Sequence, residues 1–406
     1  MVAACEGLKV IELAQVVAVP LTGRLLADFG ANVVHIEHPV RGDIGRSLGQ
    51  IRASPTGVAV GDVVPYKWEH VNRNKRGMTL DVSQEGGRQL LYKMVKTADV
   101  FLTNMRPYEI ERYHFEYDTL SKLNPRLIYA SLTGLGKKGP ERNLPAYDHT
   151  IYWARAGWSH RLALKGQAIV GKVEAFGDTV AATVLAYGIM TALYMRERTG
   201  VGQEVDVNLL QTGIFHAGWE LSGALSNPQD MQMSERTAAG GALNICYLTK
   251  DGRWLRLGFT TPERFWSKFC QAIDREDLEH DPRFQTTEVQ RQNNVALISI
   301  LDEVFLSKSL DEWKACFPDD IPWAVVQNIP EVCSDPQARI NGVFITYDHP
   351  VYGPIEVLAN PVNLSKAPAE IRRPAPEHGQ HTEEVLLEYG CTWEDIAKLK
   401  EEGIVA

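Results

Sequence analysis

The segment Leu8-Lys9-Val10-Ile11-Glu12-Leu13 is followed by a helical pattern at 21–29 and then by Asn32-Val33-Val34-His35-Ile36-Glu37. The first and third segments are short apolar runs typical of strands, and Gly30 is a natural C-cap for the helix between them. A strand, a helix and a strand in such close succession predict a βαβ unit. Such a unit requires a parallel sheet and a right-handed crossover.

The same alternation continues through the first half of the chain. Strands are expected at 78–82, 99–103 and 127–132, with a helix at about 85–97. We therefore predict an α/β fold with a doubly wound parallel sheet in a large domain. The turn at 14–20 contains no glycine, so the GxGxxG phosphate cradle of dinucleotide-binding folds is missing.

The second half of the chain shows a different pattern, a hairpin followed by helices. We predict a large α/β domain at 1–222 that binds the substrate, a smaller α+β domain at 223–330, and a C-terminal segment at 331–406 that returns to the large domain. The hairpin arms are expected at 244–248 and 254–257, helices at 262–273, 293–306, 310–316, 382–389 and 393–402, and later strands near 343–347 and 355–358.

Composition excludes some classes of protein. The net charge of −9 argues against nonspecific nucleic-acid binding, because that function requires a basic surface. The six cysteines are scattered, without a CxxC pair and without a nearby histidine at metal-ligand spacing. We therefore expect reduced thiols, no metal site and a cytoplasmic location.

Two further features bear on localisation. Residues 1–7 lack the basic and apolar regions of a secretory signal. The most apolar segment, 180–195, is shorter than the roughly 20 residues that a membrane span needs. We therefore expect a buried helix there and no membrane partner.

Asp178 stands in Phe176-Gly177-Asp178-Thr179, at the start of the long apolar helix that runs to Gly200. A carboxylate at this position faces unpaired backbone N–H groups and the positive end of the helix dipole, which favour its ionised form. Such a carboxylate can act as a nucleophile. Aspartate is also a favoured N-cap, and from this motif alone capping is the more frequent role.

Several segments carry a recognisable pattern in a fixed order. The densest is Gly177-Asp178 followed by 192–207, and a basic motif, Asn72-Arg-Asn-Lys-Arg76, leads into 78–81. Together they resemble the class III coenzyme A transferases, the family of formyl-CoA, carnitine and benzylsuccinate CoA-transferases. The other matching segments are 8–14, 25–37, 98–104, 123–134, 144–148, 250–254 and 379–386.

The resemblance implies that Asp178 is the catalytic nucleophile. In this family an aspartate attacks the thioester of a donor acyl-CoA to form a mixed anhydride, and the CoA thiolate converts the anhydride to an aspartyl-CoA thioester. A carboxylic acid acceptor then takes the CoA. Coenzyme A is thus a substrate, no permanently bound cofactor is expected, and the resemblance implies an interlocked dimer, either a homodimer or a heteromer with a related subunit.

The resemblance also implies residues that contact coenzyme A. Arginine and lysine suit its phosphates, although each of them can equally be a solvated surface charge. Asp148, which follows Tyr147 in the chain, either lines the site or caps the next helix. The implied residues are Lys75, Arg76, Asn104, Met105, Arg112 and Tyr147.

Three positions depart from the formyl-CoA branch of the family. Val17, His38 and Pro145 replace a glutamine, an arginine and a lysine of that branch. The acceptor is therefore expected to be another acid, such as an aromatic or branched dicarboxylate of the benzylsuccinate type.

An aromatic-lined acid pocket is one interpretation of Trp153, Trp158 and His160, and ordinary packing is the other. The pair Gly240-Gly241 is a candidate cover over the site, although paired glycines are usually only flexible.

Two alternatives to a catalytic transferase remain. An α-methylacyl-CoA racemase has a His-Asp pair where this chain has Tyr147-Asp148, and a tyrosine with a reference pKa of about 10 is a poor base at neutral pH. His149 replaces that base only if the loop is shifted, so we favour the transferase. The second alternative is a noncatalytic subunit of a heteromeric transferase, against which the presence of Asp178 argues.

Overall fold

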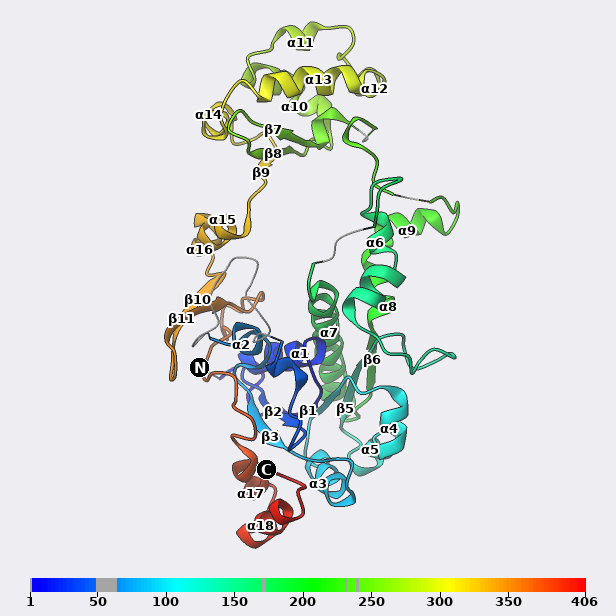
Figure 1. Cartoon of the computed structure of the whole chain (residues 1–406), viewed down its shortest axis with the longest axis vertical. Helices are drawn as coiled ribbons and strands as arrows, with labels where there is room; N and C mark the ends of the chain where they lie inside the picture. The colour runs from blue at the N-terminus through cyan, green and yellow to red at the C-terminus, as the bar shows by residue number, and fades with distance from the viewer. Residues whose placement is uncertain (1, 49–63, 170–172, 231, 239–240) are drawn as a thin grey trace. The chain divides into compact units, whose positions relative to one another are not determined.

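The computed structural model describes residues 2–48, 64–169, 173–230, 232–238 and 241–406. The chain divides into two compact units (Figure 1). The larger unit consists of 1–159, 171–228 and 339–406, and the smaller unit consists of 160–170 and 229–338. The domain boundaries given above from the sequence stay a prediction.

The larger unit is built on a six-stranded, fully parallel sheet with the order β3-β2-β1-β4-β5-β6. This is a doubly wound order, in which the direction of strand addition reverses between β1 and β4. The prediction of a doubly wound parallel sheet is confirmed. The strands are β1 (Lys9–Leu13), β2 (Asn32–Glu37), β3 (Arg76–Thr79), β4 (Val100–Thr103), β5 (Ile128–Thr133) and β6 (Glu204–Asn208).

Alternate residues of the central strands point to opposite faces of the sheet. Val10 and Val100 lie in one apolar cluster, and Ile11 and Phe101 lie in another. Both faces are therefore covered by helices. Helices α1 (Ala18–Asp28) and α7 (Phe176–Thr199) pack on the first face, and α3 (Glu85–Val95), α4 (Pro107–Tyr113), α5 (Tyr117–Leu123), α17 (Thr382–Glu388) and α18 (Trp393–Glu401) pack on the second.

Helix α7 has 24 residues and is the one helix among the described residues that is long and apolar enough to cross a membrane by length and composition. The expectation that this segment is too short for a span is therefore wrong. Core helices pass the same test, and Ala181, Leu185 and Ile189 are fully buried against the sheet. Their burial supports the interpretation of α7 as a core helix.

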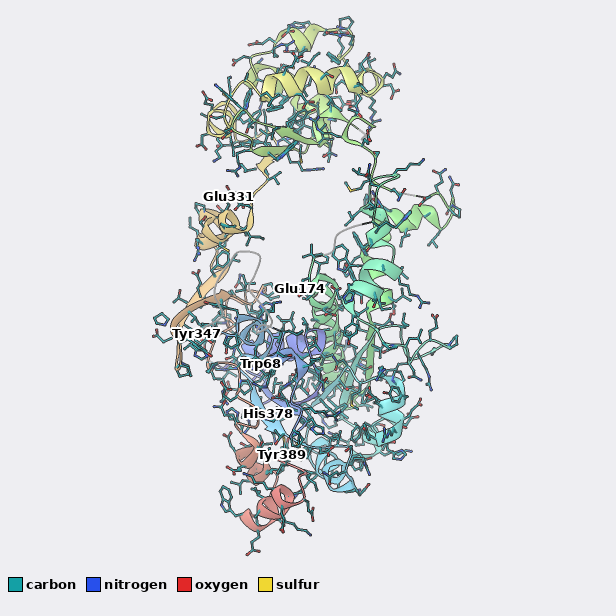
Figure 2. All side chains as sticks on the ribbon, viewed as in Figure 1. Trp68, Glu174, Glu331, Tyr347, His378 and Tyr389 are labelled. Carbon is teal, nitrogen blue, oxygen red and sulfur yellow. The ribbon has the colours of Figure 1, made fainter. Side chains whose placement is uncertain are left out.

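The C-terminal part of the larger unit adds the hairpin β10 (Phe344–His349) and β11 (Gly353–Leu358) beside α2 (Tyr66–Asn72). The Tyr347 hydroxyl donates to Glu69 Oε2 at 2.7 Å, and the Ala375 N–H donates to Glu69 Oε1 at 3.0 Å. Tyr347 and Trp68, which neighbours Glu69, are labelled in Figure 2. A buried glutamate thus joins the N-terminal and C-terminal parts of the chain.

The smaller unit has a three-stranded antiparallel sheet with helices on one face, so the predicted α+β character and hairpin are confirmed. Gly240 of the candidate cover lies outside the described residues, and Gly241 belongs to this unit. Its elements are β7 (Cys246–Leu248), β8 (Trp254–Leu257), α10 (Pro262–Ala272), α11 (Asp277–His280), α12 (Thr287–Gln292), α13 (Asn294–Phe305), α14 (Leu310–Cys316), β9 (Trp323–Val325) and α15 (Ile329–Ser334).

Strand β6 was not predicted. It lies at the edge of the sheet, and its sequence Glu204-Val-Asp-Val-Asn208 alternates with polar residues instead of forming the continuous apolar run of a central strand. The remaining elements of the larger unit are η1 (Ile44–Arg46), the π-helical turn η2 (His149–Arg155), α8 (Leu209–His216) and α9 (Gly218–Ala224), and α6 (Trp158–Arg161) spans the point where the chain leaves that unit.

Candidate active site

A cavity of about 620 Å³ lies in the larger unit beyond the carboxyl ends of β1 and β4. These are the strands between which the sheet order reverses, and open α/β sheets bind their ligands in the crevice formed at that point. The loop 14–18 after β1 and the segment 104–107 after β4 form part of its wall. The position of the cavity therefore follows from the topology of the sheet.

Asp178 lines this cavity. Other walls come from segments that also follow strand ends. They are His38 and Arg41 after β2, Asp81, Val82 and Ser83 after β3, Gly134 after β5, and the loop residues Arg142, Leu144, Pro145, Ala146 and Tyr147.

Asp178 is the third residue of α7, and the N-cap of this helix is Ala175. Ala175 has a left-handed backbone with φ of 54°, and it caps the helix without a side-chain hydrogen bond. The capping interpretation of Asp178 is therefore wrong. Its carboxylate is in the first turn, at the cavity.

Burial and, to a smaller extent, the neighbouring Asp148 carboxylate together raise the pKa of Asp178 to about 7. The helix dipole favours an ionised carboxylate by only about 0.3–1 kcal/mol, which is less than one pKa unit. Burial therefore outweighs the preference for the ionised form that the helix start was expected to give Asp178. Its protonated and ionised forms are both populated at neutral pH.

Gly177 explains how the two carboxylates come close. A Cβ at this position would clash with Asp148 Oδ1 and with the ring of Tyr152. Glycine therefore lets the first turn of α7 pack directly on Asp148, which is 6% exposed. Asp148 lies where it can influence the protonation of Asp178.

Three of the residues predicted to contact coenzyme A line the cavity with Asp178: Asn104, Met105 and Tyr147. The Asn104 side chain also exchanges two hydrogen bonds with the backbone of Gln15, at 3.1 and 2.8 Å. Tyr147 is mostly exposed, and its ring stacks on His149 with 5.8 Å between the ring centroids.

The other three predicted contacts do not line this cavity: Lys75, Arg76 and Arg112. Lys75 is fully buried, and its ammonium donates to Glu12 Oε1 at 2.6 Å. Arg76 forms a two-bond ion pair with Glu388, at 2.7 and 2.8 Å. Arg112 is exposed, with its guanidinium 5.5 Å from the ring of Tyr113.

Three arginines that the sequence reasoning did not select, Arg41, Arg106 and Arg142, line the cavity. The usable signal was their position in loops after the strands of a doubly wound sheet, where ligands bind. Arg142 is also held by Glu111 at 2.8 Å. The positions that depart from the formyl-CoA branch, Val17, His38 and Pro145, line the same cavity.

The aromatic residues proposed for an acid pocket have other contacts. Trp153 is buried, and the Trp158 indole N–H donates to Gly213 O at 3.0 Å. His160 belongs to the smaller unit and pairs with Asp230 at 2.7 Å. For the two tryptophans the packing interpretation is the one that fits.

Comparison with known proteins gives consistent matches. The sequence profile of the family described as CoA-transferase family III matches residues 5–382. An (R)-2-hydroxy-4-methylpentanoate CoA-transferase of Clostridioides difficile is 35% identical, over 98% of this chain and 99% of that protein. A cinnamoyl-CoA:phenyllactate CoA-transferase of Clostridium sporogenes is 31% identical, over 98% and 96%.

Among solved structures, a CAIB/BAIF family protein from Brucella suis superimposes with a TM-score of 0.81 and 25% sequence identity. The match covers 96% of this chain and 100% of that protein.

Proposed function

The chain belongs to CoA-transferase family III. We propose that Asp178 is the nucleophile that carries coenzyme A from an acyl-CoA to a carboxylic acid. The observation that carries the proposal is the position of Asp178 on the cavity at the reversal point of the sheet. A carboxylate there reaches a ligand that binds beyond the strand ends.

The proposed reaction has two symmetric halves. The Asp178 carboxylate attacks the thioester carbonyl, the C–S bond breaks, and an aspartyl anhydride and the CoA thiolate form. The thiolate then attacks the Asp178 carbonyl, which releases the donor acid and leaves an aspartyl-CoA thioester. The acceptor carboxylate attacks this thioester and again releases the thiolate. The thiolate takes the acceptor acyl group and restores the free carboxylate.

Only the ionised form of Asp178 can begin this sequence. Because its pKa lies at about 7, a substantial fraction of the enzyme is ionised at neutral pH. Asp148 contributes to the raised pKa, and a more basic carboxylate is a better nucleophile once it is ionised. The pair therefore suits a nucleophile that works near neutral pH.

We assign the phosphates of coenzyme A to Arg41, Arg106 and Arg142, because guanidinium groups bind phosphate oxygens in pairs. Asn104, Met105 and Tyr147 stay proposed contacts of the same ligand, supported by their place on the cavity. Lys75 and Arg76 do not line this cavity, and they pair with Glu12 and Glu388.

We propose a 2-hydroxy carboxylic acid with a branched or aromatic side chain as the acyl group or acceptor. Two relatives at 35% and 31% identity are named for 2-hydroxy-4-methylpentanoate and phenyllactate, which are both acids of this class. Val17, His38 and Pro145 on the cavity support a substrate other than formate or oxalate. A benzylsuccinate-type dicarboxylate, expected from the sequence, is the first competitor to test.

We further propose that the active form is a dimer, either of this chain or with a related subunit. Tyr187 and Tyr194 on α7 are 73% and 66% exposed, and Trp219 on α9 is 97% exposed. Large exposed apolar side chains fit burial by another chain. A single-chain mass in sedimentation at micromolar concentration would contradict this assembly.

The experiment for the proposed function is a coupled transfer assay. Acyl-CoA donors are paired with 2-hydroxy-4-methylpentanoate, phenyllactate, benzylsuccinate and oxalate, and product CoA esters are identified by mass spectrometry. Incubation with a donor alone should also leave a hydroxylamine-sensitive adduct on the peptide containing Asp178. Exchange of the α-hydrogen with deuterated solvent, without transfer or adduct, would indicate a racemase instead.

A further inference from the structure

Val16, in the loop between β1 and α1, has a left-handed backbone with φ of 73°. A β-branched residue adopts this conformation only when its surroundings impose it. Val16 lines the cavity together with Gln15, Val17 and Ala18. This part of the cavity wall is therefore held by contacts from outside the loop.

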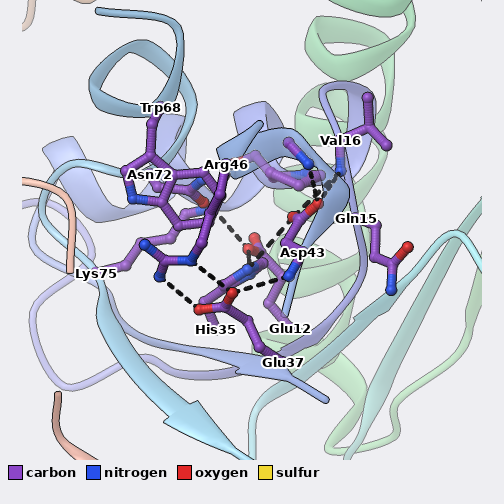
Figure 3. Close-up of polar contacts among 12 residues, drawn as sticks. Glu12, Gln15, Val16, His35, Glu37, Asp43, Arg46, Trp68, Asn72 and Lys75 are labelled. Carbon is purple, nitrogen blue, oxygen red and sulfur yellow. Dashed lines mark hydrogen bonds and ion pairs between the residues drawn. The ribbon is translucent and has the colours of Figure 1, made fainter. Parts of the chain in front are cut away.

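The contact that holds Val16 is the buried Asp43 carboxylate (Figure 3). The Val16 N–H donates to Asp43 Oδ1 at 3.0 Å and to Oδ2 at 3.2 Å. The Gly45 N–H donates to Oδ1 at 2.7 Å. Burial raises the pKa of Asp43, but His35 and these two amides lower it below its usual value, so the carboxylate stays ionised.

A charged network lies behind Asp43. His35 Nε2 lies 3.5 Å from Asp43 Oδ2, and His35 Nδ1 lies 2.7 Å from Glu12 Oε1. The Lys75 ammonium lies 2.6 Å from the same Glu12 oxygen. Burial lowers the pKa of His35, but the Asp43 and Glu12 carboxylates outweigh it and raise the value to about 9. The raised pKa favours the protonated form of His35, which lies beside the ionised Asp43 carboxylate.

The backbone of Asp43 is fixed as well. Its N–H donates to Glu37 Oε2 at 2.9 Å, and Arg46 binds both oxygens of Glu37, at 2.7 and 2.6 Å. The Arg46 guanidinium also lies 4.0 Å from the centre of a Trp68 ring (Figure 3). The position of the Asp43 carboxylate is therefore determined by contacts other than those with the loop.

The loop is held from its other side by Asn104, through the two hydrogen bonds with the Gln15 backbone. Thr22 then connects the loop to the nucleophile, because its hydroxyl lies 3.0 Å from Ala18 O and 3.2 Å from Ala182 O. Ala18 begins α1, and Ala182 lies one turn after Asp178 on α7. The Thr22 hydroxyl therefore links the start of α1, where the loop ends, to the helix that carries Asp178.

We propose that Asp43 is a positioning residue for CoA transfer: by holding Val16 in its left-handed conformation, it fixes the cavity wall against which the thioester lies beside Asp178. The inference rests on the proposed function, because it takes this cavity as the acyl-CoA site. Displacements of about 1 Å in such a wall can cost about 100-fold in rate. Asp43 and His35 act through the loop and do not touch the reacting atoms.

The first test is Asp43→Asn, which keeps the side-chain volume and removes the charge that binds Val16 and His35. We expect kcat/KM to fall about 10- to 100-fold for the best donor–acceptor pair of the wild type, mainly through kcat. Amide hydrogen exchange in peptides covering 13–20 should become faster. This second readout needs no substrate and reports directly on the loop.

The second test is Val16→Gly in the Asp43→Asn background. Glycine adopts a positive φ without steric cost, so the loop no longer needs to be forced into place. We expect kcat/KM of the double variant to be about tenfold higher than that of Asp43→Asn alone. A purely structural role of Asp43 predicts no such rescue.

Two variants in the larger unit, away from the cavity lining, serve as controls. Asp28→Asn removes another buried, ion-paired carboxylate. If that variant does not fold, the milder Tyr347→Phe removes a single, partly buried hydrogen bond. Both should leave kcat/KM per folded molecule within about twofold, since neither residue lines the cavity.

The outcomes separate the two proposals. If the wild type transfers CoA and Asp43→Asn behaves like the controls, the positioning role is overturned and the function stands. If the wild type transfers CoA to no acid, the proposed function fails. In that case, unchanged hydrogen exchange at 13–20 in Asp43→Asn also overturns the positioning role, and faster exchange supports the hold of Asp43 on the loop.

Discussion

The two ends of α1 carry similar chemistry for different purposes. Beside its N-terminus, Asp43 binds the amide of a strained residue on the cavity. At its C-terminus, Asp28 pairs with Arg24 at 2.9 Å and Arg73 at 3.0 Å, and accepts a hydrogen bond from Asn74 at 2.7 Å. Both aspartates are buried and ion-paired. Burial and pairing therefore do not reveal a role, but position relative to the strand ends does.

The largest effect is expected from Asp178→Asn, at the cavity end. Loss of a nucleophile typically costs about 10⁴-fold or more in kcat, so transfer and the hydroxylamine-sensitive adduct should both disappear. The measurement is single-turnover transfer with labelled acyl-CoA. A rate within tenfold of the wild type would show that another group forms the covalent intermediate.

Asp28→Ala tests the C-terminal end of α1. Removal of one partner leaves two buried arginines without it, which typically destabilises a protein by about 3–5 kcal/mol. The free energy of unfolding in urea should fall by that amount, while kcat/KM per folded molecule stays unchanged. A selective loss of kcat/KM would erase the distinction between the two ends.

Asp178→Asn should also change stability, in a pH-dependent way. The folded pKa of about 7 lies above the unfolded value of 3.8, so ionisation destabilises the folded state progressively as pH rises through this window. The variant should therefore be more stable than the wild type at pH 8 by about 1–3 kcal/mol, less than the full pKa shift because the cavity admits solvent. At pH 4 the two should unfold alike, and a gain of equal size at both pH values would contradict the shifted pKa.

The smallest effect concerns Asp148→Asn. The wild-type profile of kcat/KM against pH should rise through a pKa of about 7, since attack needs the ionised carboxylate. Removal of the neighbouring charge should move this limb to lower pH, while burial keeps it above the pKa of a free aspartate. Asp28→Asn is the matched control and should leave the limb in place. An unmoved limb in Asp148→Asn would assign it to another group.

Much of the fold could be predicted because its signals are local. The apolar runs around Val10 and Val33 predicted adjacent parallel strands, and the expected arms at 244–248 and 254–257 predicted the hairpin of the smaller unit. The family, the enzyme class and Asp178 as the key residue came from the order of matching segments. Family and enzyme class are confirmed, and the role of Asp178 stays a proposal.

The rest of the site depends on distant partners that the sequence does not identify. Lys75 looked like part of a basic surface motif, but Glu12, 63 positions away, binds it in the interior. The pKa of Asp178 depends on its burial in the folded protein and on Asp148, which belongs to another segment of the chain. Arg41, Arg106 and Arg142 line one cavity only because three separate segments follow strands at the same edge of the sheet.

The discontinuity of the larger unit has a consequence for how the protein is made. Its core includes Val385 and Ile396, and Arg24 binds the Leu358 carbonyl, 334 positions away. At about 5–20 residues per second, the ribosome completes the smaller unit seconds before these closing contacts exist. During that interval the part of the apolar cluster that α17 and α18 cover in the folded protein is still exposed to solvent. Long-range contacts of this kind also slow folding, so the nascent chain should be most prone to aggregate just before its last segment emerges.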